Sequence, residues 1–112
     1  MILTKKMTID ELKDIDNGYY PDRIKFCVDI ERKIVAINEE IHNDMEIELY
    51  DDGSKESSIF GGDIILKPEI SVLWEAHPNI ARNKELNIGQ GRLLSDETYK
   101  QRCFDVLKQW II

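Results

Sequence analysis

Alternating apolar and polar residues predict two strands in the first third of the chain. From Ile24 to Ile30 every second residue is apolar, and charged residues and a cysteine stand between them. A period of two is typical of a strand with one face buried. The apolar run Ile34–Ile37 follows three charged residues and is rich in β-branched side chains. It predicts a second strand that pairs back on the first as a hairpin.

The same alternation predicts a third strand in residues 41–50, which read IHNDMEIELY. Met45, Ile47 and Leu49 would face the core, and the acidic residues among them would face the opposite side. The turn-forming sequence Asp51–Ser54 follows directly. We therefore expect the third strand to end at this turn.

Two further apolar segments predict the rest of the sheet. Residues 59–66 are apolar except at Gly61-Gly62-Asp63, which predicts a strand with a bulge or a bend at the glycines. Pro68 ends this segment, and residues 70–74 predict a further short strand or a helical turn. Residues 79–94 contain Asn and Gly without a clear apolar period, so we expect them to be irregular.

Capping signals predict a helix near each end of the chain. Thr8 and Glu11 have the spacing of a capping box, and the short helix that they begin is expected to end at Gly18. Near the other terminus, Ser95 or Asp96 is expected to cap a longer helix. Its apolar residues recur at helical spacing: Tyr99, Cys103, Val106, Leu107, Trp110 and Ile111.

These elements predict an α+β fold, with an antiparallel sheet of about four strands and an N-terminal and a C-terminal helix packed on one face. The length of 112 residues fits one domain, so we assign residues 1–112 to a single α+β domain. A chain of this size buries enough surface to form one apolar core.

Composition and charge narrow the expected partners. The chain has 15 basic and 22 acidic residues, and its net charge of −7 at pH 7 disfavours nucleic acid as a partner. No apolar segment approaches the roughly 20 residues that a membrane-spanning helix needs, so we expect no membrane partner. Cys27 and Cys103 are interpreted as buried thiols, and the N-terminus lacks the pattern of a signal peptide. Both features favour a cytoplasmic protein.

The polar face of the predicted third strand is the candidate site. His42, Asp44 and Glu46, which we call the candidate row, would share one strand face, and Asp29 and Glu31 would project from a neighbouring strand. His42, Asp44 and Asp29 are the candidate metal ligands, because a histidine with carboxylates suits zinc or manganese. Glu46 and Glu31 are the candidate catalytic bases for a metal-bound water, which would support a hydrolysis.

Two alternatives explain the candidate row without chemistry. A strand with one face in water has this alternating pattern, and charged side chains protect edge strands from aggregation. Alternatively, Arg32, Arg82 or Arg92 would neutralise the carboxylates as ion pairs. The sequence is compatible with a row that is exposed and with one that residues 79–94 cover.

Several short motifs follow one another in a characteristic order: Val28-Asp29-Ile30-Glu31, His42-x-Asp44-x-Glu46, Asp52-Gly53-Ser54, Phe60-Gly61, Asn79-Ile80 and a closing amphipathic helix. In this order the chain resembles a family of small prokaryotic proteins of unknown function. It departs from the family pattern at three places: Glu39-Glu40-Ile41 stands for Gly-Glu-Leu, Phe60-Gly61 for Trp-Gly, and Ala81-Arg82 for Arg-Pro. The resemblance implies no activity, but it directs attention to the candidate row and Asp29.

Two functions remain open on this basis. The first is an interaction or regulatory domain without catalysis of its own, which binds an unknown protein partner or a second copy of itself. The second is a metal-binding domain or a metal-dependent hydrolase that uses the candidate row. We favour the first, because the sequence lacks a recognisable catalytic set. Whether the chain is an enzyme stays open.

Overall fold

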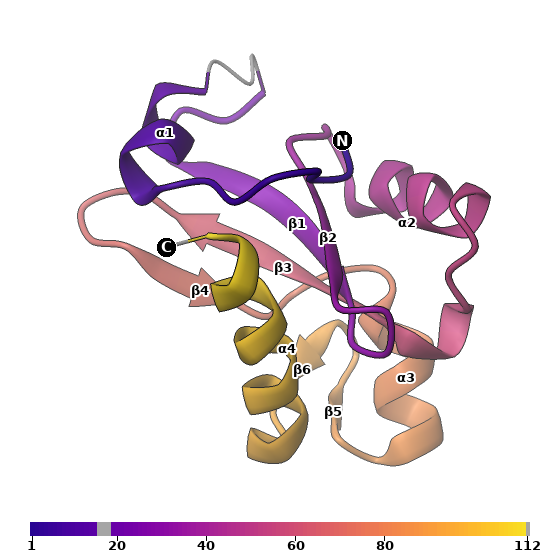
Figure 1. The fold of residues 1–112 in the computed structure, drawn as a ribbon. Coiled ribbons are helices and arrows are strands. Elements are labelled where there is room, and N and C mark those ends of the chain that lie inside the picture. The colour runs from indigo at the N-terminus through magenta and orange to yellow at the C-terminus, as the bar shows by residue number, and fades with distance from the viewer. Residues whose placement is uncertain (16–18, 112) are drawn as a thin grey trace.

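The computed structural model describes residues 1–15 and 19–111. The predicted α+β class is confirmed, with an antiparallel sheet and α-helices distributed along the chain (Figure 1). In chain order the elements are α1 (Ile9–Asp14), β1 (Arg23–Asp29), β2 (Ile34–Ile37), α2 (His42–Asp51), the short 3-10 turn η1 (Glu56–Ser58), β3 (Ile59–Ile65), β4 (Ser71–Leu73), α3 (Asn79–Leu86), β5 (Gly89–Gln90), β6 (Leu93–Leu94) and α4 (Glu97–Trp110). No helix in these residues has the length and apolar character needed to cross a membrane.

The main sheet has the strand order β2-β1-β3-β4, and all neighbouring strands are antiparallel. β1 and β2 form the expected hairpin, in which Phe26 pairs with Ile37. β3 lies on the other side of β1, where Asp63 pairs with Lys25. The strands are therefore not a simple meander, because the chain crosses from β2 to β3 through α2.

Helices cover both faces of β1, so the prediction of a half-buried strand is wrong. Ile24, Phe26 and Val28 lie in an apolar core that also contains residues of α1 and α4. Cys27 projects from the opposite face and packs with Met45 of α2 in a second apolar cluster. Figure 1 shows α2 on one side of the β1–β2 hairpin and α1 and α4 on the other.

Residues 42–50 belong to α2, so the prediction of a strand in this segment is wrong. Met45 and Leu49 are buried, whereas Ile47 is 47% exposed. A spacing of four residues is that of a helix face, yet it also fits strand alternation, because four is a multiple of two. The segment is rich in Met, Glu and Leu, which favour a helix over a strand.

β3 pairs with β1 residue for residue through Gly61 and Gly62, so the bulge predicted at these glycines is wrong. The glycines instead permit neighbouring groups to approach the strand closely. A Cβ atom on Gly61 would lie 2.6 Å from Cβ of Ala76 and 3.2 Å from Cδ2 of His42. At Gly61 the backbone of β3, without a side chain, therefore lies directly beside His42, the first residue of α2.

Residues 79–94, expected to be irregular, form α3 and the short hairpin of β5 and β6. The sequence conceals this helix because its buried residues are polar: Asn79, Arg82 and Asn83. The Asn79 side chain accepts a hydrogen bond from the Gly61 N–H (3.1 Å) and donates one to the Gly61 carbonyl (3.0 Å). It thereby continues the edge of β3 beyond the residues that pair with β4.

Both predicted helix starts are confirmed. Thr8 and Glu11 form the capping box of α1, in which each side chain accepts from the backbone N–H of the other residue. Asp96 caps α4 by accepting a hydrogen bond from the Tyr99 N–H. Gly18, the expected end of the first helix, lies outside the described residues.

Candidate functional site

The structure divides the candidate row. On a helix, residues four apart share a face, whereas residues two apart point in nearly opposite directions. His42 and Glu46 are accordingly both buried on one face of α2, and Asp44 is turned away and partly exposed. The helix thus pairs two of the predicted residues and separates the third from them.

Asp29 and Glu31 lie at the far end of β1. Oδ1 of Asp29 accepts hydrogen bonds from the N–H groups of Glu31 (2.9 Å) and Arg32 (3.0 Å), and so shapes the β1–β2 turn. The Glu31 side chain is exposed. Among the described residues, no three His, Cys, Asp or Glu side chains gather in a way that would hold a metal ion.

The arginines considered as partners of the candidate row bind elsewhere. Nη2 of Arg32 donates a hydrogen bond to Asp52 (2.7 Å), at the end of α2. The Arg82 guanidinium donates to the carbonyl oxygen of Glu56. Both arginines therefore serve acceptors outside the candidate row.

His42 is held against β3 by one edge of its ring. Nε2 lies 2.8 Å from the carbonyl oxygen of Gly62 and 3.2 Å from Oδ1 of Asp63. A carbonyl oxygen only accepts, so Nε2 carries a hydrogen and donates it. Cδ2, on the same ring edge, sits beside Gly61. Nδ1 is the ring atom opposite this edge, so it faces away from β3.

Asp63 is a buried carboxylate that gathers three basic side chains. It is 4% exposed, and its oxygens lie 3.3 Å from Nζ of Lys25 and 3.3 Å from Nη1 of Arg23, in addition to the contact with His42. Burial acts to raise the pKa of Asp63, but the hydrogen bond with His42 and the charge of Lys25 outweigh it and hold this pKa below its ordinary value. Asp63 is therefore ionised at neutral pH and fixes Lys25 and His42 in position.

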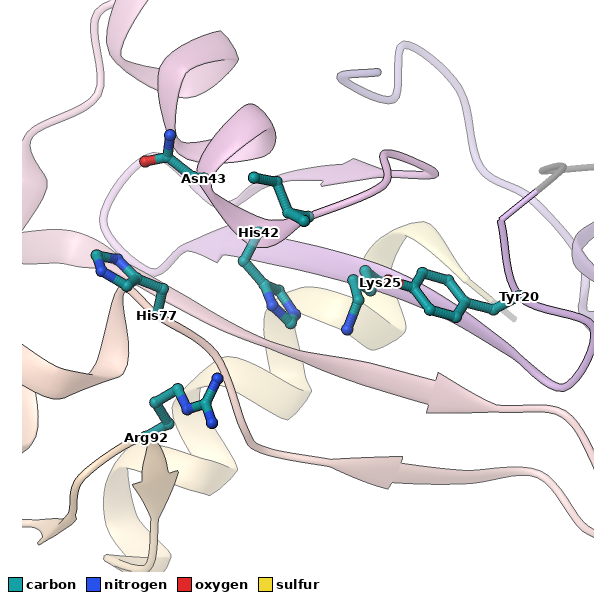
Figure 2. Close-up of a pocket in the computed structure, with 7 residues that line it drawn as sticks. Tyr20, Lys25, His42, Asn43, His77 and Arg92 are labelled. Carbon is teal, nitrogen blue, oxygen red and sulfur yellow. The ribbon is translucent and has the colours of Figure 1, made fainter.

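A pocket of about 320 Å³ opens beside His42. Among the residues that the structure describes, its lining includes basic side chains and no carboxylate, although the chain as a whole has a net charge of −7. In Figure 2 the His42 ring, the Lys25 ammonium and the Arg92 guanidinium point toward a common space, whereas the Asn43 amide points away. The lining residues are Tyr20, Lys25, Ile41, His42, Asn43, His77 and Arg92.

The N-terminus of α2 borders this pocket. His42 and Asn43 are the first two residues of the helix, and Ile41 at the N-cap position supplies no side-chain hydrogen bond. The first N–H groups of a helix have no acceptor within the helix, and the helix dipole makes this end positive. This end of α2 therefore adds to the positive potential of the basic side chains.

Tyr20 and Arg92 line the pocket from two other segments. Nζ of Lys25 lies 5.0 Å from the centroid of the Tyr20 ring, and the Tyr20 hydroxyl donates to the carbonyl of Glu40 (3.0 Å). The Arg92 side chain is 60% exposed and lies 4.0 Å from a carboxylate oxygen of Glu75. Lys25 is consequently held in place, and Arg92 has room to move.

Sequence reasoning found His42 and missed the residues around it. Asp63 did carry a signal, because it is a charged residue within a run of apolar strand residues. Such a residue needs a partner if it is buried. Lys25 is its partner across the β1–β3 pairing, and that register is not readable from the pattern alone. Arg92 and His77 carry no local signal, since the folding of residues 74–94 brings them to the pocket.

Comparison with known proteins gives a family and no activity. No curated protein matches the chain, and no solved structure matches it. A family model described as "Protein of unknown function (DUF5674)" matches residues 1–109. The expected membership of an uncharacterised family is confirmed: the chain belongs to the DUF5674 family.

Proposed function

We propose that this domain binds a small phosphate-bearing molecule in the pocket at the N-terminus of α2, as a regulatory domain without catalysis of its own. The observation that carries the proposal is the lining of that pocket. Its basic side chains are Lys25, His42, His77 and Arg92, and they adjoin a helix N-terminus that lacks a side-chain cap. Phosphate groups bind at such helix ends, where N–H groups and basic side chains converge.

The buried Asp63 supports this assignment because it orders two of the basic side chains in advance. Lys25 and His42 are fixed by contacts of 3.3 Å and 3.2 Å with its carboxylate. Donors that are already ordered lose less conformational entropy when a ligand arrives. Nδ1 of His42 faces away from β3, so protonation there would add a further donor.

The pocket volume favours a small metabolite over a polymer. About 320 Å³ is near the lower end of the roughly 300–1,000 Å³ that small-molecule sites occupy. The net charge of −7 opposes a long polyanion but leaves a local basic pocket free to bind a single anionic group. We therefore propose one phosphate group as the recognised element.

Calorimetric titration with inorganic phosphate, ethyl phosphate and propionate tests the proposal. We expect the phosphates to bind and propionate to bind more weakly, because phosphate offers more acceptor oxygens. Arg92→Gln should weaken phosphate binding severalfold to about tenfold. The matched control Lys13→Gln removes an exposed charge on α1 outside the pocket and should leave the affinity unchanged. Absence of phosphate binding at millimolar concentration would refute the proposal.

The orientation of His42 favours a second candidate function, hydrolysis of a bound phosphate ester, in which Nδ1 takes a proton from the attacking water and returns it to the leaving alcohol. A carboxylate on one ring nitrogen, with the other nitrogen directed away from it, is an arrangement used by general acid–base histidines. Release of inorganic phosphate from a panel of monoesters, lost in His42→Gln, would support a hydrolase. No release by a protein that binds phosphate would leave a binding domain without catalysis.

A further inference from the structure

A second pocket adjoins the basic pocket along α2. It has a volume of about 190 Å³, and its lining includes two acidic residues, Glu46 and Glu56, and one lysine, Lys84. His77 lines both pockets, so the two cavities share a wall. Glu46 follows His42 by one helical turn, and four residues of helix rise by about 6 Å. The basic pocket and a pocket that contains two carboxylates therefore lie side by side along α2.

Glu46 carries a buried oxygen without a hydrogen-bond partner. The residue is 6% exposed, and its Oε1 accepts a hydrogen bond from the Tyr50 hydroxyl (3.0 Å). Within the described residues, Oε2 has no hydrogen-bond partner. The nearest basic group, Nδ1 of His77, lies 3.7 Å away, which is too long for a hydrogen bond, and its side chain is 72% exposed. A buried carboxylate oxygen in this state favours a bound donor.

We propose that the ligand is a zwitterion, with its phosphate in the basic pocket and a protonated amine at Glu46. This inference rests on the proposed phosphate site. The ammonium would donate to Oε2 of Glu46 after the exposed His77 side chain, which now lies 3.7 Å from this oxygen, moves aside. Glu56, whose side chain is 70% exposed, adds a second carboxylate to the same pocket. The rise of about 6 Å between the two sites selects an aminoalkyl phosphate with a short linker.

The basic side chains of the phosphate site and the Glu46 carboxylate are held in place by separate contacts. Lys25 and His42 are positioned by Asp63 on β3, whereas Glu46 is positioned by Tyr50 on its own helix. A change at Glu46 therefore acts on amine recognition without touching the Asp63 contacts. This separation allows the two proposals to be tested independently.

Calorimetric titration with phosphoethanolamine and with ethyl phosphate, which lacks the amine, tests the inference. We expect wild-type protein to bind phosphoethanolamine at least about tenfold more tightly, since a hydrogen bond between charged groups in a buried site contributes this much. Glu46→Gln should bring the two affinities close together. The amide of Gln still accepts from Tyr50, so we expect the variant to fold. Asp44→Asn, on the other face of α2, is the matched control and should preserve the difference.

The outcomes distinguish the two proposals. If wild type binds neither compound, the phosphate site is wrong. If it binds both equally, the phosphate site stands and the zwitterion inference is overturned. If Glu46→Gln fails to fold, two other measurements decide the question: the wild-type affinity ratio and the affinities of the exposed variant Glu56→Gln. For Glu56→Gln we expect a severalfold loss of affinity for phosphoethanolamine alone. In that case an affinity ratio that is the same in Glu56→Gln as in wild type overturns the inference.

Discussion

His42 and Asp63 come together across the crossover that α2 makes between β2 and β3. Nε2 of the histidine lies 3.2 Å from Oδ1 of the aspartate, and the same nitrogen donates to the carbonyl of Gly62 (2.8 Å). The pair joins the first residue of a helix to the interior of a strand. It therefore fixes how α2 begins relative to the sheet, and the pocket is built on that junction.

Gly61→Ala should destabilise the fold, because its Cβ would lie 2.6 Å from Cβ of Ala76. We expect the free energy of unfolding to fall by about 1–3 kcal/mol, the usual cost of overpacking. Urea denaturation measures the loss. The double variant Gly61→Ala/Ala76→Gly removes the closest contact and should recover part of the stability. A double variant that is no more stable than Gly61→Ala would contradict this explanation.

Asp63→Asn should lower stability in a pH-dependent way. The pKa of Asp63 in the folded chain is below its unfolded value, so its charge stabilises the fold above about pH 3.9. That contribution is lost as the pH falls through the folded pKa. We expect a loss of roughly 1–3 kcal/mol at neutral pH and a smaller difference near about pH 3. Urea unfolding of both proteins at the two pH values tests this, and a constant difference would argue against a charge effect.

Ile41→Ser should make the protein more stable and its ligand binding weaker. Ile41 occupies the N-cap position of α2 in an extended conformation, which suits a serine that accepts from the helix N–H groups. We expect a gain of about 0.5–1 kcal/mol in the free energy of unfolding. Phosphate affinity should fall severalfold, because the serine oxygen competes for the same N–H groups. Thermal melts and calorimetry on one preparation measure both effects, and unchanged phosphate affinity would exclude a role for the helix N-terminus.

The two thiols should be unreactive in the folded protein. Burial raises the pKa of Cys27 well above its usual value and raises that of Cys103 to about 12, so little thiolate forms. We expect a thiol reagent at mildly alkaline pH to label neither residue until urea unfolds the chain. Counting thiols with and without urea checks this. Rapid labelling of one thiol in folded protein would reveal local opening around it.

The sequence predicted correctly those elements whose apolar pattern or capping residues fit only one type of secondary structure. Ile24, Phe26 and Val28 alternate over enough residues to define β1, and the side chains of Thr8 and Asp96 mark helix starts. Residues 42–50 were misassigned because Met45 and Leu49 satisfy both periods. α3 was missed because it buries Asn79 and Asn83, which bond to backbone groups and leave no apolar stripe.

The strand interpretation also affected the prediction of the candidate site. It singled out His42 and Glu46 but gave them the wrong neighbours. Their true neighbours are set by tertiary structure. Lys25 meets Asp63 through strand register, and His77 and Arg92 arrive from distant segments. A single sequence carries the identity of such residues but not their proximity.

The residues that line the basic pocket are far apart in the chain, from Tyr20 to Arg92. Between these two, lining residues come from β1, the start of α2 and the loop before α3. Such a pocket is absent from the unfolded chain, so a ligand that fills it binds the native state alone. Binding is then thermodynamically linked to unfolding, and a ligand at a hundred times its dissociation constant adds about 2.7 kcal/mol of stability. The melting temperature of the intact domain consequently reports occupancy of the pocket, whatever molecule fills it. A thermal-shift screen of phosphorylated amines would therefore identify a ligand of the pocket by the rise in melting temperature that it causes.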